Sequence, residues 1–406
     1  LTMGINMSHS GAFNVNPEAT LHILPMPVPT EDIPNDTNDN IIINTAFASV
    51  EFFTDMETVL VSNDINMRLK ARGAGLRNAE IYKSDCVIDD IDLLPTGHTK
   101  IPDGWLDSLP EDATQSKSCG RVIISASVWG DDPVPSIGSW VYNDNDNVAG
   151  EIIGHVTECG ERWSEEHGDV SGVEVQFSSI DKMKRRKCSG VYPRNTQQAI
   201  AINALLDKTK DVVVLFGPAG CGKTLLASAA ACEMVVGKGG YPQEKVIFTK
   251  TMDSQFGEIG FLPGNEHEKV APWAGAVYDN MEVIHKLSKN ELLHPTKSIE
   301  DERTAIIELK NLGFMRGRSL NHRVVIIDEA QNLNAAQMKT LLTRIGENTR
   351  VILMGNLKQI DNDYISEHSS GLTYICQKFN SWSRASIIHL ESVERSPLAE
   401  FVEENF

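Results

Sequence analysis

The sequence predicts an α/β protein whose C-terminal half is organised around a parallel β-sheet. Two segments support this prediction. The five apolar residues 212–216 lead directly into the glycine-rich segment GPAGCGKT at 217–224, and the four apolar residues 324–327 lead into Asp328 and Glu329. Short, unbroken apolar runs are typical of strands that are buried on both faces of a parallel sheet. Ligand sites form at the carboxyl ends of such strands, where both of these segments fall.

The glycine-rich segment has the G-x-x-x-x-G-K-T spacing of a phosphate-binding loop. Its glycines let the backbone curl until successive N–H groups point inward at phosphate oxygens. Lys223 then reaches the β- and γ-phosphates, and the Thr224 hydroxyl ligates Mg²⁺. The alternative is a glycine-rich turn that matches by chance, which the flanking strand and the Ala- and Leu-rich helix disfavour. We expect the nucleotide to contact Gly217, Pro218, Ala219, Gly220, Cys221, Gly222, Lys223, Thr224 and Leu225.

The second apolar run, with its two acidic residues, is typical of a Walker B strand. Asp328 falls at the strand end beside the phosphate loop, where it is expected to hold Mg²⁺ directly or through water. Glu329 is expected to orient and deprotonate the attacking water, because hydrolysis needs a carboxylate in that position. The alternative is a strand followed by a solvated acidic turn.

Three longer segments resemble the PhoH family of ATPases: 257–280, 315–346 and 355–361, which contain the FLPG, RGRSL, DEAQN and GNLKQ motifs. The resemblance runs from about Val191 to the C-terminus. It implies a single RecA-like P-loop NTPase core over 189–406, related to the first motor domain of superfamily-one helicases, with ATP and Mg²⁺ as its ligands.

The same resemblance assigns further site residues. Arg194, Asn195 and Gln198 match the adenine-contacting motif before the first strand, and Gln359 matches a glutamine that senses the γ-phosphate. Two arginines are candidates to reach ATP within or across subunits, Arg344 and Arg395.

The chain departs from the family pattern in two places. Gly355-Asn356 stands where the family commonly has Gly-Asp, so the strand end carries one charge fewer. Residues 249–251 read Thr-Lys-Thr where the family tends to carry an arginine, which keeps the positive charge but loses the planar guanidinium fork.

Residues 1–110 are expected to form a second α/β domain. The segments 38–43 and 59–82 resemble PIN-type nuclease domains, in which acidic side chains at strand ends bind Mg²⁺ or Mn²⁺ and activate water against an RNA phosphodiester. By that resemblance Asp39 and Asp64 are metal ligands. No segment before Asp39 matches the family's first strand and its acid, so we expect that strand to be missing. From the residues alone, Asp39 is a turn residue and Asp64 a helix N-cap, and nuclease activity stays open.

Residues 111–188 are expected to form a small β-rich connector with strands near 122–129 and 173–179. An all-β module beside a motor often binds single-stranded nucleic acid through aromatic side chains, although aromatic residues in short strands more often belong to the core. The candidates are Trp129, Trp140, Tyr142 and Trp163. Five basic residues follow and are either a phosphate-contacting patch or a solvated linker: Lys182, Lys184, Arg185, Arg186 and Lys187.

Composition limits the functional classes. The 406 residues carry a net charge of −19, which argues against a surface coated for non-specific duplex binding and requires any nucleic-acid contact to be local. Seven cysteines without a CxxC pair predict neither a disulfide framework nor a zinc site, and the cytoplasm is the expected compartment. No apolar stretch approaches the roughly 20 residues that cross a bilayer, so no membrane partner is expected.

A single RecA-like lobe supplies only one wall of a helicase ATP site, so we expect a neighbouring subunit to supply the other. The leading hypothesis is a homo-oligomer, a hexameric ring by resemblance, that couples ATP hydrolysis to remodelling single-stranded RNA, with single-stranded DNA as the other candidate. Two alternatives stay open. One is an ATP-regulated, metal-dependent ribonuclease, and the other is an assembly module that uses the nucleotide without motor activity.

Overall fold

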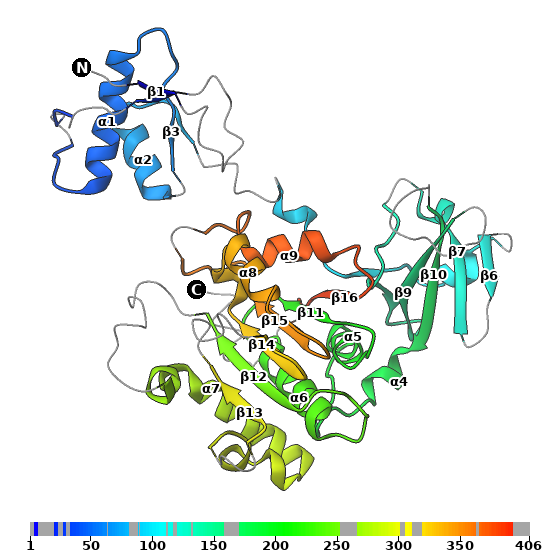
Figure 1. Cartoon of the computed structure of the whole chain (residues 1–406). Helices are drawn as coiled ribbons and strands as arrows, with labels where there is room; N and C mark the ends of the chain where they lie inside the picture. Colours follow the sequence, from blue (N-terminus) through cyan, green and yellow to red (C-terminus); the bar gives the residue numbers. More distant parts are fainter. Residues whose placement is uncertain are drawn as a thin grey trace. The chain divides into compact units, whose positions relative to one another are not determined.

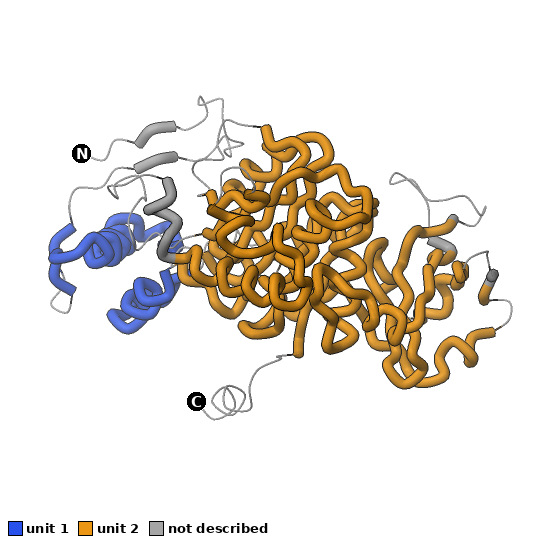
Figure 2. Tube along the Cα trace, turned by 90° about the horizontal axis from the view of Figure 1, so that it is seen from below, with its two compact units in different colours: residues 1–86 blue, residues 87–406 orange. Residues whose placement is uncertain are grey.

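The computed structural model describes residues 4–6, 20–22, 27–29, 33–62, 64–80, 88, 90–110, 113–116, 120–130, 133–157, 170–251, 266–300, 305–310, 319–362 and 365–392. The chain divides into two compact units, Leu1–Cys86 and Val87–Phe406 (Figures 1 and 2). Within the described part of the chain, no helix has the length and apolar character needed to cross a membrane.

The described part of the first unit contains two helices and two pairs of short strands. The strands β1 (Gly4–Asn6) and β2 (Thr20–His22) pair antiparallel, and β3 (Leu60–Val61) pairs parallel with β4 (Ala79–Glu80). The helices α1 (Asn38–Phe52) and α2 (Ile65–Gly73) pack on each other, and Lys70 of α2 donates to the Asn40 side chain of α1 at 2.6 Å. A small core that includes Ile43, Leu60 and Met67 holds the unit together.

The structure gives the two candidate metal ligands of this unit, Asp39 and Asp64, positions at the starts of helices. The Asp64 carboxylate caps α2 by accepting the backbone N–H groups of Asn66 at 2.7 Å and Met67 at 3.2 Å, as the N-cap interpretation predicted. Asp39 lies in the first turn of α1, so its interpretation as a turn residue was wrong. The reason is the preceding Thr37, which caps the helix and lets the Asp39 charge face the positive end of the helix dipole.

Replacing Asp64 with alanine is expected to destabilise the start of α2 by about 1 kcal/mol, because a cap that satisfies two amides is lost. Hydrogen exchange should then quicken about fivefold at the amides of Asn66 and Met67. The control is Asp39→Ala, which removes a first-turn charge but no cap and should change exchange in α1 less. Loss of Mn²⁺-dependent RNA cleavage without any change in α2 exchange would instead assign Asp64 to a metal site.

The second unit begins with a mainly antiparallel sheet. The described strands run in the order β5-β8-β9-β10-β7-β6, and only β5 and β8 pair parallel. Inward-facing Ile124, Ile152 and Val173 form its core with three further residues. The bounds are β5 (His98–Lys100), β6 (Thr114–Ser116), β7 (Arg121–Ser125), β8 (Trp140–Asn143), β9 (Val148–Thr157) and β10 (Val170–Ser179), with the short helices η3 (Ile91–Leu93), α3 (Trp105–Ser108) and η6 (Ala126–Trp129).

The structure shortens the strand expected over 122–129 and confirms that two of the aromatic residues belong to the core. The strand expected over 122–129 ends at Ser125, because the Ser125 hydroxyl accepts the Ser127 N–H and starts a 3₁₀-helix over Ala126–Trp129. Trp140 and Tyr142 are 5% and 8% exposed, so they belong to the core and are not a stacking surface. Trp129 packs against the sheet core, and Trp163 lies outside the described residues.

The antiparallel sheet contacts the nucleotide-binding half of the same unit through a hydrogen bond and an ion pair. His98 bonds through Nε2 to the backbone carbonyl of His389 at 2.7 Å, and the Lys210 ammonium pairs with the Glu151 carboxylate at 3.0 Å. Burial raises the pKa of Glu151, and the lysine opposes that shift. The connector therefore packs firmly on the following domain.

The second sheet is parallel throughout, as the two apolar runs predicted. Its described strands run in the order β13-β12-β14-β15-β11-β16, and β15 lies between the phosphate-loop strand β11 and the acidic strand β14 (Figure 1). Their bounds are β11 (Val212–Phe216), β12 (Lys245–Lys250), β13 (Ile307–Leu309), β14 (Arg323–Asp328), β15 (Arg350–Gly355) and β16 (Ala385–His389).

Helices cover both faces of this sheet, which explains the unbroken apolar runs. Val213 and Leu215 of β11 face a core shared with α5, α6 and α7, whereas Val214 and Phe216 face a core shared with α9. The helices are α4 (Ile180–Lys184), α5 (Thr196–Leu205), α6 (Lys223–Val236), α7 (Glu266–Ser288), η9 (Glu291–Leu293), η10 (Thr296–Glu300), η12 (Ala330–Asn332), α8 (Ala335–Leu342) and α9 (Gly371–Phe379).

Candidate functional site

The phosphate loop connects the end of β11 to the first residue of α6. Gly217, Gly220 and Gly222 all have positive φ angles, and a Cβ on Gly217 would meet the Leu390 carbonyl oxygen at 2.1 Å. Lys223 folds back over the loop and donates to the carbonyls of Gly217 and Pro218, each at 2.7 Å. The loop thus has the curled backbone that the sequence predicted, with the ammonium group held over it.

Helix α5 is hydrogen-bonded to the phosphate loop. Asn195 is its N-cap and accepts the Gln198 N–H at 2.8 Å, while the buried Gln198 side chain donates to the Cys221 carbonyl at 3.1 Å and accepts the Arg194 N–H at 2.9 Å. The Gln198 amide therefore links the start of α5 to the phosphate loop and lies directly beside Gly222.

The acidic pair ends β14 in an unusual backbone conformation. Glu329 has φ 53° and ψ 38°, a left-handed conformation that few non-glycine residues adopt and that is often found at functional sites. Its N–H bonds to the Asp328 carboxylate at 3.0 Å. Burial and the neighbouring Glu329 charge raise the pKa of Asp328 to about 6, although Lys250 and Lys223 oppose the shift. Two neighbouring carboxylates, both partly buried, therefore lie at the end of β14.

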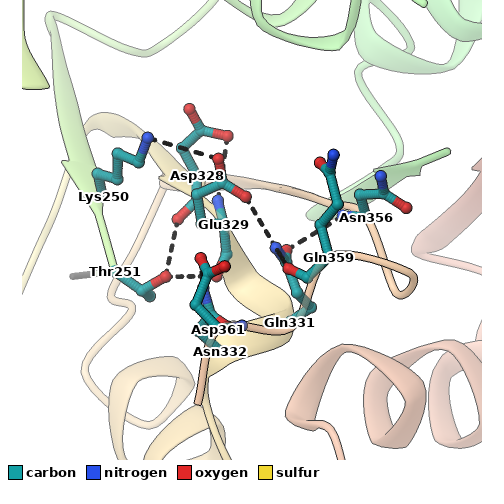
Figure 3. Close-up of polar contacts among 9 residues, drawn as sticks. All are labelled: Lys250, Thr251, Asp328, Glu329, Gln331, Asn332, Asn356, Gln359 and Asp361. Atoms are coloured by element: carbon teal, nitrogen blue, oxygen red, sulfur yellow. Dashed lines mark hydrogen bonds and ion pairs between the residues drawn. The ribbon is translucent and has the colours of Figure 1, made fainter. Parts of the chain in front are cut away.

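Glu329 is oriented by groups at the end of β12 and in η12, the short helix that follows Glu329 itself (Figure 3). Lys250, at the end of β12, lies opposite Asp328 in the strand register and pairs with Glu329 Oε1 at 3.4 Å. Gln331 donates to Glu329 Oε2 at 2.8 Å. The Thr251 hydroxyl donates to the Glu329 carbonyl, which fixes the backbone at this turn. Both carboxylate oxygens of Glu329 are thus held by donors.

Gln331 also joins the acidic turn to the segment after β15 (Figure 3). The side chain is fully buried; it donates to the Gln359 carbonyl at 2.8 Å and accepts the Asn356 N–H at 3.1 Å. Gly355 leaves room for this amide, because a Cβ there would meet Gln331 Oε1 at 2.5 Å. A single amide thereby connects the candidate base to the candidate γ-phosphate sensor.

Replacing Gln331 with leucine should lower kcat at least tenfold while the KM for ATP changes less than about threefold. The reason is the lost hydrogen bond to a charged carboxylate, a bond that contributes about 1.5–3 kcal/mol. Steady-state phosphate release measures both constants. The control is Gln377→Leu, the same change on an exposed position of α9. An unchanged kcat would show that Gln331 does not position Glu329.

These elements surround a cavity of about 630 Å³ at the carboxyl ends of the strands. The phosphate loop, the acidic turn and the sensor segment all line it. Of the residues singled out from sequence, it is lined by Arg194, Gln198, Ala219, Gly220, Gly222, Lys223, Thr224, Leu225, Asp328, Glu329, Asn356 and Gln359. The sequence motifs that are distant along the chain therefore converge on one site.

Other candidates lie elsewhere. Cys221 is fully buried behind the loop. Arg344 is exposed in the turn after α8 and does not line the cavity. Arg395 and the FLPG motif lie outside the described residues. In the first unit, the described His, Cys, Asp and Glu side chains form no group of three that could hold a metal ion around Asp39 or Asp64.

Sequence reasoning missed one wall of the cavity. Tyr192, which is 54% exposed, lines it together with Val283 and Leu287 of α7. Only the packing of α7 against the start of this domain brings these side chains together, and no motif marks them. Their apolar surfaces are suited to the flat faces of a nucleobase.

The site suits a divalent cation. The Thr224 hydroxyl and the Asp328 carboxylate line the same cavity, and hard oxygen donors of this kind are those that Mg²⁺ prefers. Burial and the neighbouring Glu329 charge raise the pKa of Asp328, and a bound cation would oppose that shift. Thr224 and Asp328 are therefore the residues that would hold Mg²⁺ with a nucleotide.

Comparison with known families agrees with this geometry. A family model described as PhoH-like protein matches residues 190–406, which include the entire cavity-forming domain. This chain belongs to the PhoH family. A second model, described as PIN domain, matches residues 8–82. The chain is therefore a P-loop NTPase of the PhoH family that carries an N-terminal PIN domain, as the motifs predicted.

Two relatives called Protein PhoH2 align with most of this chain, and one called Protein PhoH aligns with about half of it. It is 31% identical to Protein PhoH2 of Bacillus subtilis over 90% of this chain and 76% of the relative. Protein PhoH2 of Mycolicibacterium smegmatis is 29% identical over 91% of this chain and 74% of the relative. Protein PhoH of Escherichia coli strain K12 is 34% identical over 47% of this chain and 50% of the relative.

Solved structures add little. The Pif1 helicase from Candida albicans aligns with a TM-score of 0.27 at 15% identity, over 52% of this chain and 43% of the helicase. The Arterivirus nonstructural protein 10 helicase aligns with a TM-score of 0.25 at 13% identity, over 70% of this chain and 50% of the helicase. The chain spans half or less of these helicases, and the TM-scores are too low for any conclusion about fold or function.

Proposed function

We propose that this PhoH-family protein hydrolyses ATP and uses it to remodel single-stranded RNA. The supporting observation is the single cavity in which Lys223, Thr224, Asp328 and Glu329 meet. A binding module has no need for a second carboxylate whose oxygens are both held by donors, whereas a hydrolase does.

Each residue has a distinct part in the proposed reaction. Lys223 and the N–H groups of the loop bind the β- and γ-phosphates, and Thr224 and Asp328 hold Mg²⁺, which neutralises phosphate charge when bound. Glu329 orients a water molecule and accepts its proton. Gln359, joined to Glu329 through Gln331, responds to the γ-phosphate. Tyr192 and the apolar residues of α7 form the wall for the base.

We further propose that the protein acts as a homo-oligomer, with a hexameric ring as the expected form. The described domain has one RecA-like sheet, and the exposed Arg344 does not reach the cavity of its own chain. An arginine from a neighbouring subunit would neutralise charge on the transferred phosphoryl group, an effect worth about 10³-fold or more in rate. Arg344 and Arg395 are the candidates.

The choice of RNA rests on the combination of a PIN domain with the ATPase domain. The deciding experiment measures ATP hydrolysis with and without single-stranded RNA, single-stranded DNA and duplex. RNA should raise the rate most. An ATPase that no nucleic acid stimulates, but whose sedimentation changes with ATP, would favour the assembly module. We propose the cytoplasm as the compartment.

The PIN domain favours a second candidate function, that of a metal-dependent ribonuclease regulated by ATP. It predicts RNA cleavage with Mg²⁺ or Mn²⁺ that requires Asp39 or Asp64 but not Glu329. Cleavage that persists in the full chain after Glu329→Gln would favour this candidate over the motor.

A further inference from the structure

A cluster of five cations lies between the antiparallel sheet and the nucleotide-binding domain. The segment from Asp181 to Lys187 contains one acid and five basic residues in a chain whose net charge is −19. Four of the five basic side chains are exposed, and Lys184 is 36% exposed. Because the protein as a whole is acidic, a nucleic acid can bind only where basic residues locally outnumber acidic ones, as they do here.

The segment is anchored to the protein and is not a solvated linker. Ile180, Met183 and Cys188 alternate with the cations and are at most 4% exposed, within the same core as α5 and α6. Helix α4 packs against both β10 and α5 (Figure 1). The cations are therefore held close together, and their mutual repulsion must be tolerated by the fold.

Beside these cations the surface is hollowed. A cavity of about 470 Å³ is lined by six residues, none of which is acidic: Ser178, Lys182, Met183, Arg185, Arg186 and Asn203. Arg186 is already oriented, since it donates to Asn203 Oδ1 at 2.6 Å. In the described part of the chain, Lys182 and Arg185 form no ion pair, so both charges remain available to an anion.

The hollow shares a helix with the ATP site. Asn203 lies near the end of α5, and Gln198 of the same helix donates to the phosphate-loop carbonyl of Cys221. Five residues of helix span only about 7.5 Å. An anion that contacts Arg186 and Asn203 therefore binds one end of the helix whose other end holds the phosphate loop.

We propose that this basic hollow binds the phosphate backbone of single-stranded RNA. The hollow offers cations and neutral hydrogen-bonding groups but few surfaces for stacking bases, so it should contact the strand without reading its sequence. The choice of RNA as the ligand rests on the proposed function. A contact here also gives RNA a route to alter the phosphate loop through α5.

The test compares two double variants of the full chain that lose the same charge. Lys182→Gln with Arg185→Gln removes the unpaired cations of the hollow, and Lys100→Gln with Lys238→Gln removes two exposed lysines from other surfaces. Binding of a fluorescein-labelled 20-nucleotide oligo(U), and of the matching DNA, is followed by anisotropy across a range of KCl concentrations. Thermal unfolding checks that both variants are folded.

The hollow variant should bind RNA about tenfold more weakly and lose about 1.4 from the slope of log affinity against log salt, because each phosphate contact on a single strand contributes about 0.7. A third variant, Arg186→Gln, should weaken binding in the same direction. Equal affinities and slopes for the two double variants would overturn the proposal. So would a change in sedimentation without a change in RNA affinity, which would make the hollow an interface between copies.

The two proposals fail in different ways. If RNA binds through the hollow but leaves ATP hydrolysis unchanged, the motor function is wrong and the binding site stands. If RNA stimulates hydrolysis equally in both double variants, the motor function stands and the hollow is not its RNA site. A wild-type chain that binds neither RNA nor DNA contradicts both.

Discussion

Replacing Glu329 with glutamine should lower ATP turnover by about 10²- to 10⁴-fold while ATP still binds. Positioned general bases contribute rate factors of this size, and the amide cannot accept the proton of water. The replacement preserves size, and its carbonyl oxygen can still accept the Gln331 hydrogen bond. Phosphate release at saturating ATP measures turnover, and a fluorescent ATP analogue measures binding.

The same sheet edge offers a matched control. Asp361 is an exposed acid that also bonds a neighbouring amide, Asn332, but it does not line the cavity (Figure 3). Asp361→Asn should change turnover less than about threefold. If Glu329→Gln retains more than a tenth of wild-type turnover, then Glu329 is not the base.

The strands that build this site were predictable because their chemistry is local. Continuous apolar runs over 212–216 and 324–327 identify buried parallel strands, and the residues that follow each run reveal its carboxyl end. The glycine spacing is equally local, since positive φ angles are needed within a single loop. No knowledge of distant contacts was required for Lys223, Thr224 or the acidic pair.

The orientation of Glu329 could not be predicted, because it depends on strand register. Lys250 reaches Glu329 only because β12 and β14 pair with Lys250 opposite Asp328. A shift of one residue would turn the lysine to the other face of the sheet. Gln331 and Asn356 likewise meet through the pairing of β14 with β15. The sequence shows these residues but not their partners.

Replacing Lys223 with alanine should raise the Kd for ATP by about 100-fold or more. An ammonium group that donates charge-assisted hydrogen bonds to two phosphates contributes about 3 kcal/mol, which corresponds to that factor. In the structure this ammonium donates to the loop carbonyls of Gly217 and Pro218, so it lies beside the loop that is expected to bind the phosphates. Arginine should not rescue the loss, because its planar fork needs more room than a point charge.

The measurement is the rise in unfolding temperature that Mg-ATP produces, since a ligand stabilises the folded state according to its concentration relative to Kd. Wild-type protein should show a clear rise at millimolar ATP, and the Lys223→Ala protein little or none. Lys358→Ala is the control, because Lys358 is an exposed lysine after β15 that does not line the cavity. Equal stabilisation of the wild-type and Lys223→Ala proteins by ATP would mean that the phosphates bind elsewhere, and the assigned roles of Thr224, Asp328 and Glu329 would fail with it.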